Sequence, residues 1–546
     1  MTLQRLPPDY LPPPDHLPLV VRTLPEIHYP ARLNAAVELL DRAIARGWGS
    51  RPALYFEGRT LSYGEVARDA NRLGNALRGL GVVPGDRVLI RLGDQPELVI
   101  TIHALLKIGA IAVPTYPMLR APDLLYREGD TEAVAIVVGA DLIDEVEQAR
   151  AGFRHVRHLI VVPDTRENGY LSYANLLSLA SADLEAAPTG RDDIATLVYT
   201  SGSTGDPKGA LHSHADLLAS ADTYCRTCVQ PQPGEVFCGP APIPFSAGLG
   251  YFVVFPLRFG AAAILSKAKS PDRVLDAAVA HHGTVLFATA TYYNMILKVE
   301  GPRVRERLRG VRQTVVGGEP VPRELAEQWE AESGHSLLQI IGTTEMFHIF
   351  LSPRWGVDPP RPTSAGRPVP GYQVVVRNPD GFEEVERGEA GLLTVIGPTG
   401  TKYWRKPEEQ RRAVRNGWNI CQDLVRMDEE RFVYHLARID DMIVSAGYNI
   451  SPVEVENILL KHPAVAEVAC VAAPDPSGMR SSIVKAYVVP RGGTAPTESL
   501  AEDLQRFFRE RGAPYMYPRA IAFLAELPKT VNGKIRRSEL RRLDRP

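Results

Sequence analysis

Residues 199–209 form a glycine- and hydroxyl-rich stretch with the composition of a phosphate-binding loop. The stretch reads Tyr-Thr-Ser-Gly-Ser-Thr-Gly-Asp-Pro-Lys-Gly and follows an apolar run at 194–198 that is typical of a buried strand. Glycines let backbone amides approach a ligand closely, hydroxyls add hydrogen-bond donors, and Lys208 adds a positive charge. The order of residues differs from a Walker A loop, Gly-x-x-x-x-Gly-Lys-Ser/Thr. We therefore expect a polyphosphate site of another kind, with a flexible surface linker as the alternative.

A second glycine and hydroxyl turn, Ile341-Gly-Thr-Thr-Glu345, ends in a carboxylate. A carboxylate beside a polyphosphate requires a cation between the two groups, and Mg²⁺ is the common one. The turn therefore predicts a magnesium-assisted phosphate site. The alternative is that Glu345 caps a helix.

Three stretches toward the C-terminal end suggest a joint, a helix start and a mobile turn. Arg438-Ile-Asp-Asp441 interrupts two apolar stretches, as an interdomain joint does. Ser451-Pro-Val-Glu454 has the pattern of a capping box with proline at the first helical position. Pro528-Lys-Thr-Val-Asn-Gly-Lys534 is turn-forming, so it could carry a lysine to a remote site. Taken alone, an exposed loop lysine is more often simply solvated.

Together these stretches resemble the adenylate-forming superfamily, which includes acyl- and aryl-CoA synthetases, firefly luciferase and the adenylation domains of peptide synthetases. Residues 201–209 match its phosphate loop, Ser/Thr-Gly-Ser/Thr-Thr-Gly-x-Pro-Lys-Gly, and 342–345 match its Gly-x-Thr-Glu loop. The resemblance implies an α/β protein with a large multi-sheet N-terminal domain and a small α+β C-terminal domain on a hinge. We expect a Pro-rich arm at 1–30, a nucleotide- and aryl-acid-binding domain at 31–438, and a small mobile domain at 439–546.

The resemblance also implies a role for each matching residue. Lys534, Lys208 and Glu345 would be catalytic, and Glu345 and Thr204 are the candidate Mg²⁺ ligands. Asp440 would be the hinge, and Gly447 and Tyr448 would border a CoA tunnel. The residues expected to bind ATP or AMP are Thr200, Ser201, Gly202, Ser203, Thr204, Gly205, Gly318, Glu319, Gly342, Thr343, Thr344, Asp423 and Arg438.

A narrower resemblance, to the benzoate- and 2-aminobenzoate-CoA ligases, covers most of residues 30–535. It is carried by Thr-Glu-Met-x-His-Ile-Phe at 344–350 and by the stretches at 212–224, 255–260 and 445–450. The aryl pocket implied by it comprises Phe245, Ser246, Ala247, Gly248, Gly317, Gly342, His348 and Ile349. Ala247 and Gly317 are smaller than their usual counterparts, which predicts room for a substituted ring. The alternative for His348 is a core histidine in an apolar segment.

These resemblances predict ATP-dependent activation of an aromatic acid to acyl-AMP, followed by transfer to coenzyme A. The expected acid is a substituted benzoate such as 2-aminobenzoate or a hydroxylated analogue, and the cofactors are ATP, Mg²⁺ and coenzyme A. One alternative is an aryl-acid adenylating enzyme that loads a carrier protein. Another is a non-catalytic sensor of AMP or an acyl-adenylate, because Cys421-Gln422 replaces the family's Thr-Gly before Asp423. Gln422 lacks the backbone freedom of the glycine that it replaces, so the resemblance does not establish the conformation of this turn.

Composition limits the remaining possibilities. A chain of 546 residues exceeds the size of a single core, and 45% hydrophobic and 23% charged residues are ordinary globular values. A net charge of −2 offers no broad field for nucleic acid or membranes. The five cysteines, with a lone Cys225-x-x-Cys228, indicate a reducing compartment and not a zinc site. With no secretory signal or membrane-length apolar run, we expect a cytoplasmic monomer or homodimer without nucleic-acid or membrane partners. The basic cluster at 536–545 is a solvated face or an anion contact.

The elements that must position these residues follow from local patterns. Ser62-Tyr-Gly-Glu65 predicts the start of a helix that ends at Gly79–Gly81. Short apolar runs that alternate with helical patterns predict a layered α/β domain with parallel strands. Those strands are expected at 87–92, 133–138, 158–162 and 285–288, and residues 315–320 are expected to form a strand that ends in a turn. A helix is expected at 216–227, and a β subdomain from 378 to 396, with turns at Pro-Asp-Gly and Arg-Gly-Glu. The C-terminal α+β unit is expected to have strands at 465–472, 483–489 and 520–524 and a helix at 500–511.

Overall fold

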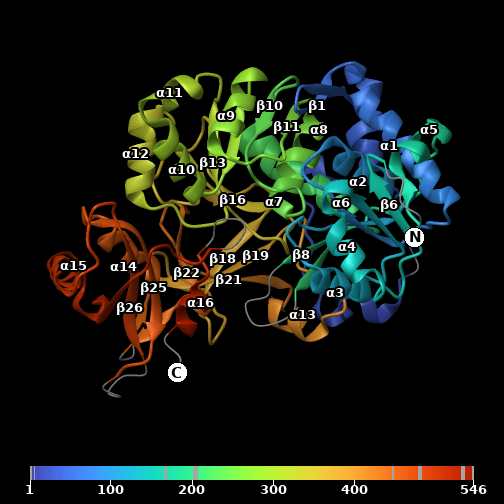
Figure 1. Ribbon diagram of the computed structural model, residues 1–546. Helices are drawn as coiled ribbons and strands as arrows, with labels where there is room; N and C mark the ends of the chain where they lie inside the picture. The colour runs from blue at the N-terminus through green and yellow to red at the C-terminus, as the bar shows by residue number, and fades with distance from the viewer. Residues whose placement is uncertain are drawn as a thin grey trace.

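The computed structural model describes residues 3–4, 6–164, 169–200, 207–445, 448–476, 482–529 and 535–543, with the backbone alone described at 440, 444, 448 and 449 (Figure 1). Its larger part is built on two seven-stranded sheets. The first has the order β7-β6-β5-β3-β4-β8-β9, with β3 (Arg87–Arg91), β4 (Ile111–Pro114), β5 (Ala135–Gly139), β6 (His158–Val162), β7 (Leu171–Ser172), β8 (Ile194–Thr200) and β9 (Lys208–Ser213). The second has the order β14-β13-β12-β10-β11-β1-β2, with β1 (Pro52–Phe56), β2 (Arg59–Ser62), β10 (Val236–Cys238), β11 (Ala262–Leu265), β12 (Val285–Ala288), β13 (Gln313–Val316) and β14 (Leu337–Gln339).

Short apolar runs form the strands of both sheets. Every position of β3, β5 and β12 is buried, as is typical of parallel strands that are covered on both faces. Within these two sheets, the described strands pair in parallel except for the edge pairs β1–β2 and β8–β9, which are antiparallel. The predictions at 87–92, 133–138, 158–162 and 285–288 are confirmed, with ends that differ by at most two residues.

Helices cover both faces of both sheets and give five layers, α-β-α-β-α (Figure 1). Between the sheets lie α1 (Tyr63–Gly79), α2 (Pro96–Ile108) and α6 (His214–Ser220), whose apolar side chains share one core with both sheets. Outside the first sheet lie α3 (Ala121–Thr131) and α4 (Ile143–Arg150). Outside the second lie α9 (Pro271–Ala280), α10 (Ala290–Glu300) and α12 (Arg323–Ser333). Shorter helices are α5 (Tyr173–Leu179), α7 (Ser246–Leu249), α8 (Phe255–Phe259) and α11 (Val304–Arg307).

The predicted helix starts are confirmed, with one difference in helix type. Ser62 and Glu65 make both halves of a capping box at the start of α1. The helix predicted over 216–227 begins earlier, at His214, where Ser213 caps it. From Ala221 to Val229 the same helix continues as a π-helix, which the 3.6-residue pattern did not predict.

A β subdomain follows the two large sheets. Its five strands pair antiparallel: β18 (Gln373–Arg377), β19 (Ala390–Ile396), β20 (Val414–Arg415), β21 (Trp418–Met427) and β22 (Val433–Arg438). The turns predicted at Pro-Asp-Gly and Arg-Gly-Glu are present, at 379–381 and 387–388, whereas the strand predicted between them, at 382–386, is not formed. The first strand ends at Arg377, because the Asn378 side chain accepts hydrogen bonds from the amides of Asp380 and Gly381 and forms a turn. A smaller sheet contains β15 (Ile341–Gly342), β16 (Ile349–Ser352) and β17 (Arg367–Pro368).

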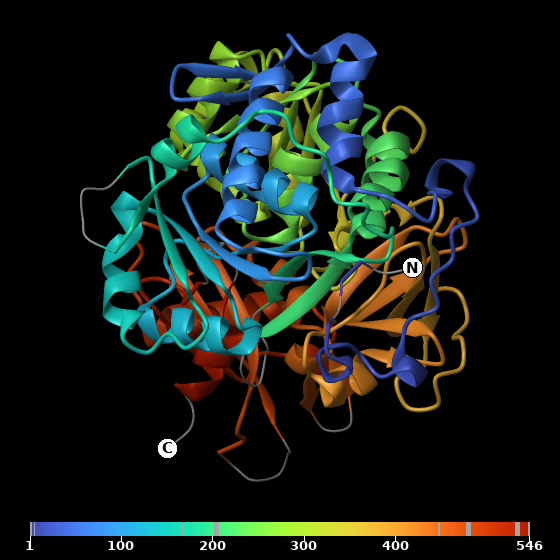
Figure 2. The same ribbon diagram turned by 90° about the vertical axis from the view of Figure 1, so that its right-hand side faces the viewer.

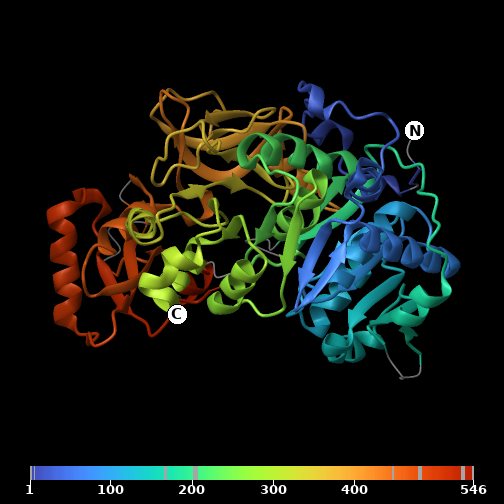
Figure 3. The ribbon, with the colours of Figure 1, turned by 90° about the horizontal axis from the view of Figure 1, so that it is seen from above.

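The C-terminal part is a small α+β unit at one end of the molecule, with α15 at its outer edge (Figure 3). The unit contains the hairpin β23 (Ile443–Ser445) and β24 (Tyr448–Ile450), the sheet β25 (Val465–Ala473), β26 (Ile483–Pro490) and β27 (Ala520–Phe523), and the helices α14 (Pro452–Leu459), α15 (Glu498–Arg511) and α16 (Arg537–Arg542). Ser451 caps α14 by accepting from the Glu454 amide. The predicted strands and helix are confirmed. Among the described residues, three arginines of the basic cluster make ion pairs within the unit: Arg536 with Glu539 at 2.5 Å, Arg537 with Glu456 at 2.7 Å and Arg541 with Asp441 at 3.0 Å.

The Pro-rich arm lies on the body of the protein, along the edge of the β subdomain (Figure 2). The Leu19 amide donates to the Gly417 carbonyl, and the Val21 amide donates to that of Gly397. Near its start, the buried Gln4 side chain donates to the Ile194 carbonyl at 2.6 Å and accepts from the Ile194 amide at 2.8 Å. The arm therefore joins β8 of the first sheet to the β subdomain.

Within the described residues, no helix has the length and apolar character needed to cross a membrane. The cytoplasmic location stays a prediction.

Candidate active site

The paired strands β8 and β9 flank the predicted phosphate loop in the sequence. Thr200 at the end of β8 is the register partner of Lys208 at the start of β9. The hydroxyl of Tyr126 donates to the Pro207 carbonyl at 3.0 Å and fixes the chain just before the lysine. The predicted ligand residues Ser201, Gly202, Ser203, Thr204 and Gly205 lie outside the described residues, as do Gly447 and Lys534.

Lys208 has two partners from the segment that follows β19. Its ammonium Nζ lies 2.5 Å from Oε2 of Glu409, on helix α13 (Pro407–Ala413). The same nitrogen lies 5.6 Å from the centre of the Tyr403 ring, a distance at which a cation is attracted to an aromatic face.

Tyr403 connects Lys208 to the predicted magnesium ligand. Its hydroxyl donates a hydrogen bond of 2.8 Å to Oε1 of Glu345. Burial raises the pKa of the Tyr403 hydroxyl far above its usual range, and the neighbouring carboxylate of Glu345 raises it further. The group is therefore a permanent donor. Tyr403 is not among the residues that the sequence predicts, because a tyrosine in a Gly-Thr-Lys-Tyr-Trp stretch carries no spacing pattern that points to a residue some sixty positions earlier.

The turn that presents Glu345 is held by its own side chains and by close backbone packing. The Thr343 hydroxyl accepts from the Met346 amide at 3.2 Å. A Cβ at Gly342 would stand 2.5 Å from the His348 carbonyl oxygen, so only glycine fits there. The Ser246 hydroxyl of α7 lies 3.4 Å from that of Thr344 and donates to it. The turn therefore lies against the start of α7, where the aryl pocket is predicted.

The segment that follows β13 contains the predicted nucleotide-binding residues Gly318 and Glu319. Gly318 has φ +88°, the left-handed conformation that favours glycine. The Glu319 carboxylate accepts from the amide of Thr291 at 2.5 Å and from its hydroxyl at 3.1 Å, so it caps the start of α10. A Cβ at Gly317 would meet Ile340 at 2.8 Å. The space that the missing methyl leaves is thus filled by Ile340, and Gly317 gives no support to the prediction of a larger pocket.

His348 lies in an aromatic cluster behind α7. Its side chain is buried, and its ring centre lies 4.4 Å from that of Phe255 and 5.4 Å from that of Tyr251. Burial lowers the pKa of His348 to about 3, so the ring is neutral at working pH. Nε2 lies 3.3 Å from the Ala247 carbonyl, which can only accept, so Nε2 carries the proton. Nδ1 is then an acceptor, and it finds no partner among the described residues.

Small residues allow this close packing. A Cβ at Gly250 would stand 2.1 Å from Nε2 of His348. Tyr224 and Tyr251, whose hydroxyls lie 2.5 Å apart, complete the cluster. No sequence pattern points to these two tyrosines, which lie on two π-helical segments, Ala221–Val229 and Gly250–Val254.

The predicted ribose-binding pair lies on neighbouring strands. Asp423 of β21 and Arg438 of β22 are register partners, and Arg438 Nη1 lies 3.8 Å from Asp423 Oδ1. His435 adds a contact of 3.1 Å from Nε2 to the same oxygen. Gln422 has φ +59°, inside the left-handed region. The chain therefore keeps a glycine-type backbone beside Asp423 although the residue is glutamine.

The hinge and tunnel residues are only partly described. The backbone at 440 belongs to a 3₁₀ turn over Ile439–Asp441, and that at 448 begins β24. The boundary after Arg438 stays a prediction.

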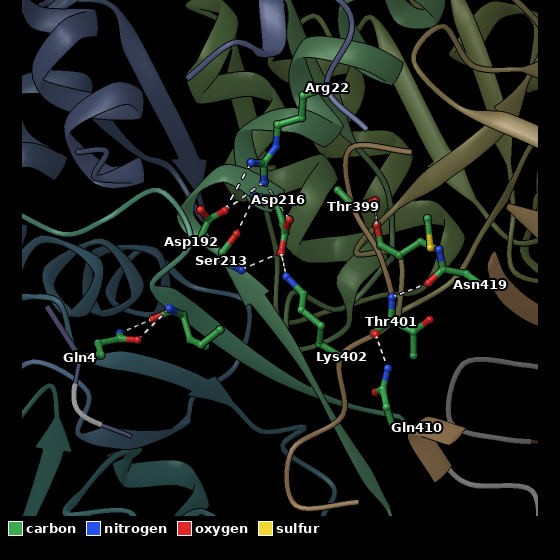
Figure 4. Close-up of polar contacts among 12 residues, drawn as sticks. Gln4, Arg22, Asp192, Ser213, Asp216, Thr399, Thr401, Lys402, Gln410 and Asn419 are labelled. Carbon is green, nitrogen blue, oxygen red and sulfur yellow. Dashed lines mark hydrogen bonds and ion pairs between the residues drawn. The ribbon is translucent and has the colours of Figure 1, made fainter. Parts of the chain in front are cut away.

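A polar network flanks the site on the side of the arm (Figure 4). Lys402 donates to Asp216 at 2.6 Å, and Asp216 accepts from the Ser213 amide at 2.9 Å. The Thr401 amide donates to Asn419, and the Gln410 side chain donates to the Thr401 carbonyl. Residues 401–403 are therefore tied to α6, β21 and α13, and this fixes the direction in which Tyr403 points.

Comparison with known proteins gives consistent matches over nearly the whole chain. A family model described as AMP-binding enzyme matches residues 41–404, and one described as AMP-binding enzyme C-terminal domain matches 454–534. The benzoate–CoA ligase of Thauera aromatica is 35% identical over 523 residues, covering 95% of this chain and 98% of that protein.

Two solved structures agree with this. The anthranilate CoA ligase AuaEII in complex with anthranoyl-AMP has a TM-score of 0.89 and 31% identity, covering 95% of this chain and 99% of that one. A benzoate CoA ligase from Burkholderia xenovorans LB400 has a TM-score of 0.84 and 33% identity, covering 93% and 99%. The chain belongs to the AMP-binding enzymes, the adenylate-forming superfamily with its large N-terminal and small C-terminal domain. Within that superfamily it is a member of the aryl-CoA ligase family of AMP-forming acid–thiol ligases.

Proposed function

We propose that the protein converts a substituted benzoate, ATP and coenzyme A to the aryl-CoA thioester, AMP and pyrophosphate. In the first step a carboxylate oxygen attacks the α-phosphorus of ATP, and the bond to pyrophosphate breaks. In the second step the CoA thiolate attacks the acyl carbon, and AMP leaves. Both reactants of the first step are anionic, so the protein must supply cations and aligned donors, not a nucleophile.

The observation that carries this proposal is the meeting of Lys208 and Glu345 at Tyr403, beside the start of α7. Lys208 and the loop at 200–205 would hold the β- and γ-phosphates, and Thr343 and Thr344 would border the adenine. Asp423 and Arg438, paired across β21 and β22, would hold the ribose: the Asp423 carboxylate would accept from its hydroxyls, and the Arg438 guanidinium would donate to its oxygens. Lys534 would bridge the carboxylate and the α-phosphate. The Glu319 side chain would act on the nucleotide only indirectly, because its carboxylate accepts from the Thr291 amide and caps the start of α10.

The residues present fit a magnesium ion that is held jointly by the protein and by the phosphates of the substrate. Among the described residues no three His, Cys, Asp or Glu side chains converge as a metal cage. Mg²⁺ in phosphoryl-transfer sites needs only one or two carboxylates, because substrate phosphates supply the rest. Glu345, held by Tyr403, would be that carboxylate, with Thr204 as a second ligand. When bound, the ion neutralises phosphate charge.

The proposed substrate carries an amino or hydroxyl group on the ring. Nδ1 of His348 is a buried acceptor without a described partner, and a buried acceptor that stays unpaired costs free energy. An N–H or O–H on the ring of the substrate would satisfy it, whereas plain benzoate would not. Ala247, whose carbonyl orients this histidine, is the small residue that would leave space beside the ring.

The test is release of pyrophosphate from ATP with a panel of benzoates, with and without CoA. We expect release with 2-amino- and hydroxybenzoates, a higher kcat/KM for them than for benzoate, and CoA-dependent formation of the thioester. Thioester formed only on a carrier protein would favour the carrier-loading alternative. Binding of AMP without any pyrophosphate release would favour the sensor.

A further inference from the structure

The contact between Lys208 and Glu409 joins residues 201 positions apart. It is an ion pair of 2.5 Å whose side chains are only 20% and 27% exposed. The Lys208 hydrogen bond and charge lower the pKa of the Glu409 carboxyl despite its partial burial. The partner of Lys208 is therefore an anion throughout the working pH range.

Helix α13 is anchored so that Glu409 is held close to this lysine. The neighbouring Gln410 is fully buried, and its Nε2 donates to the Thr401 carbonyl at 2.8 Å (Figure 4). The same nitrogen donates to the His16 carbonyl at 2.9 Å. Its Oε1 accepts from the Tyr403 amide at 2.9 Å. One residue thus ties α13 to the arm and to the Tyr403 segment, and the position of Glu409 follows from the fold.

The same ammonium cannot serve this carboxylate and a polyphosphate equally well. Both are anions, and like charges that share one small cation repel each other. Glu409 also forms a second ion pair, because Arg412 Nη1 lies 3.4 Å from its Oε1. Release of Lys208 would therefore leave Glu409 with a partner.

We propose that Glu409 is an internal competitor for the polyphosphate. Its carboxylate occupies Lys208 when no nucleotide is bound, leaves when the triphosphate enters, and returns as pyrophosphate departs. The inference rests on the proposed role of Lys208. Glu409 weakens the binding of ATP and of pyrophosphate together, and so it promotes release of the first product.

The test is Glu409→Gln, which keeps the shape of the side chain and removes its charge. Calorimetric titration of the full-length protein with a non-hydrolysable ATP analogue and Mg²⁺, and separately with pyrophosphate, should show both Kd values lowered by about threefold to tenfold. Glu409→Ala should act in the same direction. The matched control is Glu408→Gln on the same helix, whose side chain is 72% exposed and paired with Arg411, and it should leave both Kd values unchanged.

Equal or weaker binding by both Glu409 variants, with unchanged thermal stability, would mean that Glu409 only orients Lys208, and would overturn the proposal. Lys208→Ala separates this outcome from failure of the proposed function. If that variant binds the nucleotide as well as the natural protein does, Lys208 is not a phosphate ligand and both ideas fail. If it binds more weakly, the competitor proposal further requires that Glu409→Gln has no effect in the Lys208→Ala background.

Discussion

His348 combines burial in an aromatic cluster with an acceptor nitrogen that has no described partner. If this position only filled space in the core, an apolar residue would suit it better, because an apolar side chain has no buried polar atom without a hydrogen-bond partner. The fixed tautomer, set by the Ala247 carbonyl, makes the ring a selective acceptor rather than an adaptable one. At the scale of single residues, this is the feature that most directly bears on the choice of acid.

His348→Leu should therefore lower the ratio of 2-aminobenzoate to benzoate kcat/KM by about twofold to tenfold, the effect of one neutral hydrogen bond. Benzoate turnover by the same variant controls for general damage. Because burial lowers the pKa of His348 to about 3, the ratio in the natural protein should not change between pH 6 and 9. A ratio that follows a titration near neutral pH, or one that the variant leaves unchanged, would contradict this role.

Lys534→Ala tests the residue that the family resemblance places in the first half-reaction. Acyl-adenylate formation should fall by about 10²-fold or more, since one donor at an oxyanion site has an effect of that size. Thioester formation from supplied aryl-AMP and CoA should largely survive, because in the family this lysine leaves the site before the second step. Equal loss of both steps, with the fold intact, would show that the lysine does not act selectively in adenylation.

At the scale of elements, strand β21 contains a local conformation that its sequence does not favour. Gln422 has φ +59°, and the pairing of β19 with β21 shifts register beside it, between Leu392 and Thr394. A residue with a side chain in this conformation costs about 1–2 kcal/mol relative to glycine. The register shift turns Asp423 toward Arg438 and His435, so the strained position lies where the ribose is expected.

Gln422→Gly should raise the free energy of unfolding by up to about 1 kcal/mol, because glycine adopts this conformation without strain, although it also gains entropy in the unfolded chain. The KM for ATP should stay within about tenfold, since Asp423 keeps its place. Chemical denaturation and ATP titration of activity measure the two quantities. A large gain in rate would mean that the natural residue impairs nucleotide handling, as expected of a sensor.

The local elements were largely predictable from the sequence, and their contacts were not. The apolar run at 285–288 coincides with β12 at both ends, and Ser62 caps α1 as its pattern predicts. Both were predictable because burial and capping leave local signals in the sequence. The pairing of Lys208 with Glu409 leaves no local signal in the sequence, because two charged residues 201 positions apart look like ordinary solvated groups. The family motifs name the candidate site residues, whose roles stay predictions, whereas the contacts of Tyr403 and Glu409 with those motifs follow only from the fold.

At the scale of the whole molecule, the segment 397–403 joins parts that are distant in the chain. Val21 of the arm bonds to Gly397, Tyr403 reaches Glu345, and Lys402 bonds to Asp216 of α6. Arg22 of the arm lies 4.0 Å from the same carboxylate (Figure 4). The β subdomain, the arm and the first sheet therefore meet at Asp216, behind the hairpin that carries Lys208.

Lys402→Met removes the main partner of Asp216, whose side chain is 1% exposed. Burial by itself would raise the pKa of Asp216, but the Lys402 charge and hydrogen bond, together with the Ser213 amide and His212, more than offset this and hold it below the usual value. Because the folded pKa is depressed, the pair stabilises the protein above the carboxyl's unfolded pKa, and this contribution is lost as pH falls toward the folded pKa. Breaking a buried pair by removing one partner costs about 3–5 kcal/mol.

Chemical denaturation at pH 7 should therefore show a loss of about 3–5 kcal/mol in Lys402→Met. The control is Arg411→Met on α13, which removes an exposed partner of Glu408 and should cost less than about 1 kcal/mol. The difference between the natural protein and Lys402→Met should shrink as pH falls through the acidic range, since protonated Asp216 no longer needs a cation. A difference that is small at pH 7, or that grows on acidification, would show that the pair does not hold these three parts together.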